Sequence, residues 1–210
     1  TDLSSFYLDI CKDRIYTMKK DSVERRAGQT TLFELTDRMV RIMAPVLSFT
    51  AEEVWQYVPG RTTGEEKRSV HTELFPKVEK EWVNETLADR WEKIIQVRKE
   101  VSKVLEGARK NGDIGHSLDA TVTLFSPGEF GVDFLEYKDD LSFIFITSQV
   151  LLSHSAEPPK GAYTSDEIEG LWITVNQAPG EKCERCWRYS DTVGSLKEHP
   201  AVCTRCGDNL

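Results

Sequence analysis

Several features that would assign this chain to a common functional class are absent from its sequence. It has no uninterrupted apolar run of about eighteen residues, which a membrane-spanning helix requires. The opening residues, TDLSSFYLDICKDR, lack the apolar region and small-residue cleavage site of a signal peptide. There is no glycine-rich phosphate loop. Positive charge is not in excess either: the net charge of −8 argues against non-specific binding to polyanions.

What the chain does contain is enough apolar material for a folded core. Its 210 residues are 39% hydrophobic and include five tryptophans, which suffices for one large domain or two small ones. The chain lacks an initiator methionine and begins inside an apolar pattern of helical period. We therefore expect it to be the C-terminal piece of a longer protein.

Cysteine is scarce until the last thirty residues. Residues 1–182 contain only Cys11, which lies in an apolar helical pattern and is expected to be buried. The tail has two C-x-x-C pairs separated by sixteen residues, a spacing typical of a four-thiolate zinc site. Two residues between ligands allow a tight turn that directs both sulfurs at one cation. The predicted ligands are Cys183, Cys186, Cys203 and Cys206.

Four thiolates fill a tetrahedral site, so this zinc ion is expected to be structural rather than catalytic. Disulfides are the alternative, but they are typical of secreted, cysteine-dense domains. A tail this short buries little surface, so metal binding should supply most of its folding free energy, about 10 kcal/mol or more.

The residues beside the cysteines suggest a contact surface. An arginine next to an aromatic side chain suits stacking on an unpaired RNA base. The alternative is that Trp187 covers the small core of the tail. Basic and acidic residues balance over residues 181–210, which weakens the RNA interpretation. The candidate RNA contacts here are Arg185, Trp187, Arg188 and Arg205.

Residues 1–118 are predicted to be helical. Apolar residues recur at helical spacing over 3–18, 32–47 and 81–111. Pro45 should end the second helix, and Thr50 with Glu53 predicts a capping box for a further helix ending near residue 58. Together these helices are expected to form a bundle.

The last of these helices has an apolar stripe along Ile94, Val97 and Val101. Three lysines, Lys99, Lys103 and Lys110, lie on its opposite face and form a basic ridge. This ridge is a candidate RNA contact, and the alternative is an ordinary solvated face.

Beyond Gly112 the pattern changes to that of strands. Residues 120–125, 149–152 and 171–177 are predicted strands, whereas 141–146 suits either a helix or a strand. The predicted fold is therefore mainly α, with a helical bundle in 1–118, a small α/β unit with a linker in 119–178, and a four-cysteine zinc knot in 179–210. The four histidines show no pairing with a serine or cysteine nucleophile, and we identify no catalytic residue.

Longer motifs resemble those of a known family. The segments SSFYLDICKDRIYT, TLFELTDRMVRIMAPVLSFTAEEVWQYVPG and SVHTELFP are similar to the anticodon-binding helical bundle of bacterial isoleucyl-tRNA synthetases, which belong to class Ia. The tail GEKCERCWRYSDTVG…HPAVCTRC resembles the zinc-binding domain of the same family. The helical motifs also occur in the valyl and leucyl relatives, so the tail is the more specific signal.

The resemblance implies that this chain binds the anticodon stem-loop of tRNA(Ile). ATP and Mg²⁺ would then act in a catalytic domain outside this sequence, which aminoacylates the tRNA. It also implies a cytoplasmic protein without membrane contact, and we expect a monomer. One alternative is the DNA-binding zinc tail of a formamidopyrimidine-DNA glycosylase-like enzyme. Another is a purely structural, zinc-stapled interaction module.

Overall fold

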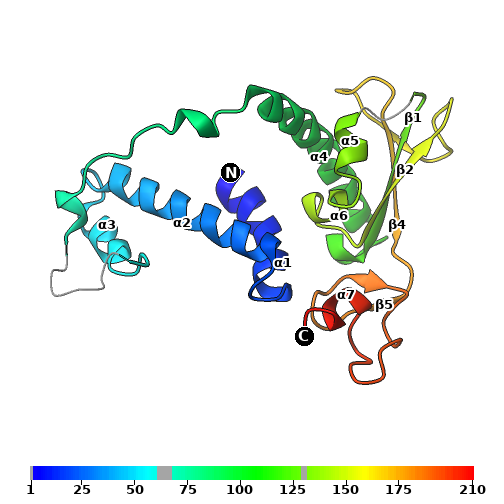
Figure 1. The fold of residues 1–210 in the computed structure, drawn as a ribbon. Coiled ribbons are helices and arrows are strands. Elements are labelled where there is room, and N and C mark those ends of the chain that lie inside the picture. The colour runs from blue at the N-terminus through cyan, green and yellow to red at the C-terminus, as the bar shows by residue number, and fades with distance from the viewer. Residues whose placement is uncertain (1, 61–67, 129–131) are drawn as a thin grey trace. The chain divides into compact units, whose positions relative to one another are not determined.

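The structure is a computed structural model that describes residues 2–60, 68–128 and 132–210. Its contacts divide the chain into two compact units, each considered by itself below. Unit 1 comprises Thr1–Thr17 and Asn84–Leu210, and unit 2 comprises Met18–Val83. The described residues contain more helix than strand, and the strands form one small mixed sheet and a two-stranded hairpin (Figure 1). Within the described residues, no helix has the length and apolar character needed to cross a membrane.

Unit 2 is built around helices α2 (Val23–Met43) and α3 (Ser48–Trp55). Helix α2 begins where the Ser22 hydroxyl accepts a hydrogen bond from the Arg25 N–H, and it ends before Pro45 as predicted. Two short 3-10 turns follow, η2 (Val70–Thr72) and η3 (Lys80–Trp82). The core of this unit consists of Val40, Ala44, Ala51, Trp55, Val58 and Val70.

The predicted capping box at the start of α3 is wrong. The helix begins at Ser48, two residues before Thr50, and no side chain caps it. The chain enters α3 directly from a turn, where the Ala51 N–H already donates to the Leu47 carbonyl. The same motif also predicts a hydrophobic staple between Phe49 and Val54, and this is wrong because Phe49 is 93% exposed. Helix α3 also ends at Trp55, three residues earlier than predicted.

Unit 1 begins with a π-helical turn, η1 (Asp2–Tyr7), and helix α1 (Leu8–Thr17). Its longest helix is α4 (Glu85–Asn111), which starts four residues later than predicted because the Asn84 side chain caps it. Gly112 ends α4 in the left-handed conformation, at φ 82°, which glycine adopts without a steric cost.

The sheet of unit 1 has the order β2-β1-β4-β3. Strands β1 (Ala120–Ser126) and β2 (Gln149–His154) are parallel, whereas β4 (Trp172–Gln177) is antiparallel to both β1 and β3 (Tyr163–Thr164). All three predicted strands are confirmed. The ambiguous segment at 141–146 contains a short helix, α6 (Leu141–Ile144), which follows α5 (Val132–Glu136).

Helix α4 packs its apolar stripe against this sheet (Figure 1). Ile94, Val97 and Val101 are buried with Val122, Leu124 and Ile173 from the strands. The chain then leaves β4 for the cysteine-rich tail, which holds the hairpin β5 (Glu181–Lys182) and β6 (Tyr189–Ser190) and the short helix α7 (Thr204–Gly207).

Candidate metal centre and neighbouring contacts

The four cysteines of the tail meet at one point. Cys183 directly follows β5, and Cys206 lies within α7. All four sulfurs lie within 4.8 Å of one another, and Cys186 and Cys203 are 3.9 Å apart. A tetrahedral zinc ion with bonds of about 2.3 Å would hold its sulfurs roughly 3.8 Å apart. None of the cysteines forms a disulfide. The donor set therefore fits a four-thiolate metal site.

Backbone hydrogen bonds shape both turns that carry the ligands. In the first turn the Trp187 N–H donates to the Cys183 carbonyl at 2.8 Å, and in the second the Gly207 N–H donates to the Cys203 carbonyl at 2.9 Å. A bond from the Glu184 N–H to the Ala201 carbonyl joins the two turns. Gly180 is needed at the entrance, because a Cβ there would lie 2.3 Å from the backbone of Ser190.

The four thiols also influence one another's ionisation. Hydrogen bonding from the Cys206 thiol lowers the pKa of Cys186 to about 4, and the same contact raises the pKa of Cys206. Burial raises the pKa of Cys203. Without a cation, one thiolate therefore opposes ionisation of its neighbours. A dication at the centre would remove that opposition and allow four thiolates to coexist.

Two arginines of the tail bind the rest of unit 1. Arg188 donates from Nε and Nη2 to the Thr147 carbonyl, at 3.1 and 2.7 Å. Arg205 forms a bidentate pair with the Asp13 carboxylate of α1, with both bonds at 2.8 Å. Both guanidiniums lie over the Phe143 ring, at 4.2 Å for Arg188 and 5.3 Å for Arg205. These contacts fix the metal centre against α1 and α6.

The environments of these two arginines differ electrostatically. Burial lowers the pKa of Arg188. Burial acts in the same direction on Arg205, but hydrogen bonds and the negative charge of Asp13 outweigh it and raise the pKa of Arg205. Arg185 remains within the tail, where its Nη1 donates to the carbonyls of Cys206 and Asn209 at 2.8 and 3.0 Å.

The Trp187 side chain lies at the surface of the tail. Its side chain is 61% exposed, and its φ of 65° is a left-handed conformation that costs about 1 kcal/mol or more for a bulky residue. Trp187 borders a hollow of about 560 Å³, which Tyr16 and His116 also line. The core of the tail is instead covered by Val193 and Val202, so the exposed indole is available for contacts.

The three lysines predicted on α4 are all exposed, but they differ in their contacts. The Lys103 ammonium lies 2.5 Å from Glu100, a buried carboxylate, and 3.8 Å from Glu167. For Lys99 and Lys110, the part of the chain that the structure describes offers no ion-pair partner. Lys99 and Lys110 are thus the two lysines of the basic ridge whose charge is not paired within the described residues.

Sequence reasoning missed the buried carboxylate of Glu100. It accepts hydrogen bonds from the hydroxyls of Ser165 and Tyr163, at 2.7 and 3.1 Å, as well as from Lys103. Burial raises the pKa of Glu100, but these hydrogen bonds outweigh that effect and lower it. The only sequence signal was one acidic residue beside Val101 on the apolar side of α4.

Comparisons with known proteins match both parts of the chain. A family profile described as "Anticodon-binding domain of tRNA ligase" matches residues 1–124. A second profile, described as "Zinc finger found in FPG and IleRS", matches residues 180–209. Together with the clustered sulfurs, the second match supports a structural Zn²⁺ bound by the tail.

Several similar proteins share the description isoleucine–tRNA ligase. The relative from Thermoanaerobacter pseudethanolicus is 47% identical over 210 residues, which is 100% of this chain. The relative from Geobacter sulfurreducens is 49% identical over 208 residues (98%), and that from Klebsiella pneumoniae is 41% identical over 214 residues (100%). The chain spans 22% of the length of each relative.

Proposed function

The chain belongs to the family of anticodon-binding domains of tRNA ligases, and on that premise we propose that it recognises the anticodon stem-loop of tRNA(Ile). The observation that carries this proposal is the anticodon-binding match over residues 1–124, followed in the same chain by the zinc-finger match. The relatives that cover both matches are described as isoleucine–tRNA ligases. Aminoacylation, with ATP and Mg²⁺, would take place in a catalytic domain outside these 210 residues, since the chain spans 22% of the length of its relatives.

The zinc-binding tail would serve as a rigid platform for RNA. Cys183, Cys186, Cys203 and Cys206 would hold the ion, which supplies folding free energy and no open coordination position. The exposed indole of Trp187 suits stacking on an unpaired base, a contact worth about 1–3 kcal/mol.

Arginines and lysines would complete the contact with RNA. Arg185 and Arg188 line the same hollow as Trp187 and would contact RNA beside it. Arg205 would act mainly through its pair with Asp13, which holds the tail in place. Lys99 and Lys110 would contact phosphates, which position RNA without reading its sequence. Lys103 lies in the same row, but its pairing with Glu100 leaves it less available.

We also propose an organisation for the chain. Residues 1–118 would form the anticodon-binding helical bundle of a class Ia synthetase, 119–178 the α/β junction, and 179–210 the zinc domain. The protein would act as a monomer in the cytoplasm. Limited proteolysis before and after zinc chelation tests this division, since chelation should release the segment after residue 178 first.

The function is tested by fluorescence anisotropy with three labelled nucleic acids: the anticodon stem-loop of tRNA(Ile), the same stem-loop with its three anticodon bases replaced, and a duplex DNA. We expect the first to bind at least about tenfold more tightly than the second, a difference of about 1.4 kcal/mol. Equal affinity for the two stem-loops, or a preference for duplex DNA, would reject the proposal and favour the glycosylase-like alternative or a structural module.

A further inference from the structure

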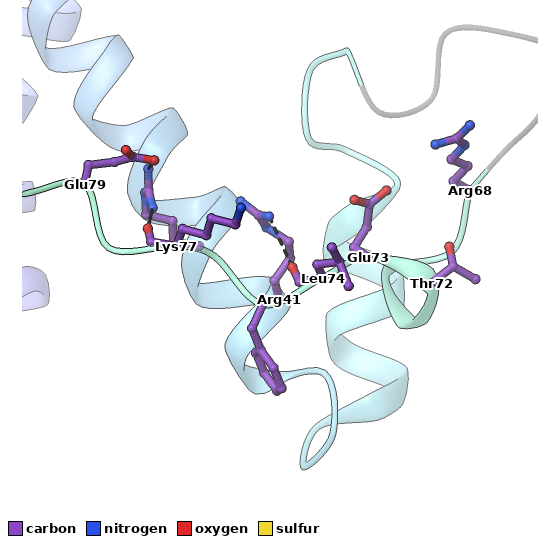
Figure 2. A pocket seen from close by; sticks show the side chains of 9 residues that line it. Arg41, Arg68, Thr72, Glu73, Leu74, Lys77 and Glu79 are labelled. Carbon is purple, nitrogen blue, oxygen red and sulfur yellow. Dashed lines mark hydrogen bonds and ion pairs between the residues drawn. The ribbon is translucent and has the colours of Figure 1, made fainter.

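Arginine side chains hold segments together in both units, but in unit 1 one of them also reaches the metal centre. Unit 2 shows the simpler case, beside a hollow of about 680 Å³ (Figure 2). There Arg41 pairs with Asp37 on α2 and donates from Nη1 to the Leu74 carbonyl at 3.2 Å. Arg38 donates in the same way to the Lys77 carbonyl at 2.9 Å. These contacts hold the segment after η2 against α2.

Arg205 of the tail contacts groups from three parts of unit 1. Its two Nη atoms donate to the Asp13 carboxylate of α1, and its guanidinium lies over the Phe143 ring of α6. The same guanidinium also donates a hydrogen bond to the Cys186 sulfur. After the larger effect of the Cys206 thiol, this bond helps to lower the pKa of Cys186. One side chain thus touches a zinc ligand and both helices on which the tail is docked.

Arg188 forms a second link between the cysteines and the docking surface. Its backbone N–H donates to the Cys186 sulfur, and its carbonyl accepts from the Cys183 N–H at 2.9 Å. Its side chain donates to the Thr147 carbonyl, and its guanidinium lies 4.2 Å from the centre of the Phe143 ring. Phe143 therefore contacts both arginines that connect the cysteine turns to the rest of unit 1.

The charge of a loaded site makes the position of these guanidiniums important. Four thiolates outweigh one Zn²⁺ by two negative charges, so cations held beside the sulfurs favour the loaded state. Asp13 offsets part of the charge of Arg205, but it also fixes the guanidinium through both Nη atoms. The orientation of Arg205 toward Cys186 thus depends on a residue of α1.

We propose that Arg205 is a positioning residue that couples zinc binding by the tail to the docking of the tail on α1 and α6. Zinc fixes the two cysteine turns and, with them, the arginines that dock the tail. Docking in turn holds the arginines where they stabilise the thiolates. Such a coupling is reciprocal: docking raises the affinity for zinc by the same factor by which zinc strengthens docking. Residues outside the tail therefore help to set its zinc affinity.

Phe143→Leu tests the coupling without changing any charge. The zinc affinity of the 210-residue chain is measured at pH 7 by competition with a chelator of known affinity. We expect binding to weaken about three- to tenfold, because both guanidiniums lose their contact with the ring. Phe125→Leu is the matched control and should leave zinc affinity unchanged. Phe125 is a half-buried residue at the end of β1 that pairs with Trp172, whereas the tail follows the opposite end of β4.

Two substitutions of Arg205 separate its charge from its geometry. Arg205→Gln should weaken zinc binding by about ten- to a hundredfold, as is typical when a partner of a metal ligand is removed. Arg205→Lys keeps the charge but loses the planar fork that reaches two groups at once, so its affinity should stay at least about threefold below that of the unmodified chain. Full recovery in Arg205→Lys would show that charge alone matters and would overturn the proposal.

Hydrogen exchange of the unmodified chain tests the reverse direction of the coupling. Removal of zinc by a chelator should speed exchange in α1 and in residues 141–147, whereas the amides of β1 should not change. Unaltered exchange in α1 would overturn the proposal, as would unchanged zinc affinity in both Phe143→Leu and Arg205→Gln. A loss in Phe125→Leu equal to that in Phe143→Leu would trace the effect to general loosening of unit 1 and would also overturn it.

Discussion

Replacing Asp13 by asparagine should loosen the zinc-binding tail from α1. The substitution keeps the size of the side chain but removes the charge that Arg205 meets in two bonds of 2.8 Å. Arg205 would keep its contact with Phe143 and lose its ion pair. Because Asp13 and Arg205 lie 192 residues apart in sequence, this is a test of tertiary docking rather than of local helix stability.

The expected loss of stability depends on how deeply the pair of Asp13 and Arg205 is buried. The side chain of Arg205 is 28% exposed and that of Asp13 is 20% exposed. Fully exposed pairs contribute about 0–1 kcal/mol, and removing one partner of a fully buried pair costs about 3–5 kcal/mol. A partly buried, bidentate pair lies between these limits, so Asp13→Asn should destabilise the docked tail by about 1–3 kcal/mol.

Hydrogen exchange resolved by mass spectrometry measures this loss directly. Amides of residues 204–210 and of α1 should exchange faster in Asp13→Asn, whereas those of α4 and the sheet should not change. Asp9→Asn is the matched control: Asp9 lies on the same helix and pairs with Lys12 at 2.5 Å, but Lys12 is 65% exposed. We expect this control to leave exchange in the tail unchanged.

A double-mutant cycle separates the pair from other effects of substitution. Asp13→Asn and Arg205→Gln should couple by at least about 1 kcal/mol, because each removes the same interaction. Coupling near zero, or equal exchange in Asp13→Asn and Asp9→Asn, would refute the claim that this pair fixes the metal centre against α1.

Three further predictions concern other parts of the chain. Cys183→Ser should lower the zinc content measured by elemental analysis and unfold the tail, while the helical circular dichroism signal stays largely intact. Trp187→Gly should relieve left-handed backbone strain and stabilise the tail by about 1 kcal/mol in chemical denaturation, yet weaken anticodon stem-loop binding by about 1–3 kcal/mol. Glu100→Gln should reduce thermal stability at pH 7 and also flatten its acid dependence. The pKa of Glu100 is lowered in the folded state, so its contribution is present above the unfolded pKa of about 4.3 and is lost as pH falls through the folded value.

Local patterns in the sequence were sufficient to predict several elements. Alternating apolar residues identified strands β1, β2 and β4, and the two C-x-x-C pairs predicted the sulfur cluster, because each depends on residues close together in the chain. Pro45 correctly limited α2. The start of α3 was misjudged because helical hydrogen bonding already begins at the Leu47 carbonyl, so Thr50 lies inside the helix and not at its cap.

Contacts between segments far apart in the sequence could not be predicted from the spacing of residues along the chain. Arg188 and Arg205 were identified as candidate RNA contacts from their place beside the cysteines, but their partners, the Thr147 carbonyl and Asp13, are set by tertiary packing. The same holds for Glu100, whose burial depends on hydroxyl groups more than sixty residues away.

The most direct test of the central claim is the affinity of one zinc-loaded sample for the tRNA(Ile) anticodon stem-loop, measured before and after the metal is removed by a chelator. The sample should hold one zinc ion per chain, and chelation should weaken binding by at least about tenfold, with recovery when zinc is restored. A chain that contains no zinc and has paired cysteines, or whose RNA affinity is unchanged by chelation, would contradict the account.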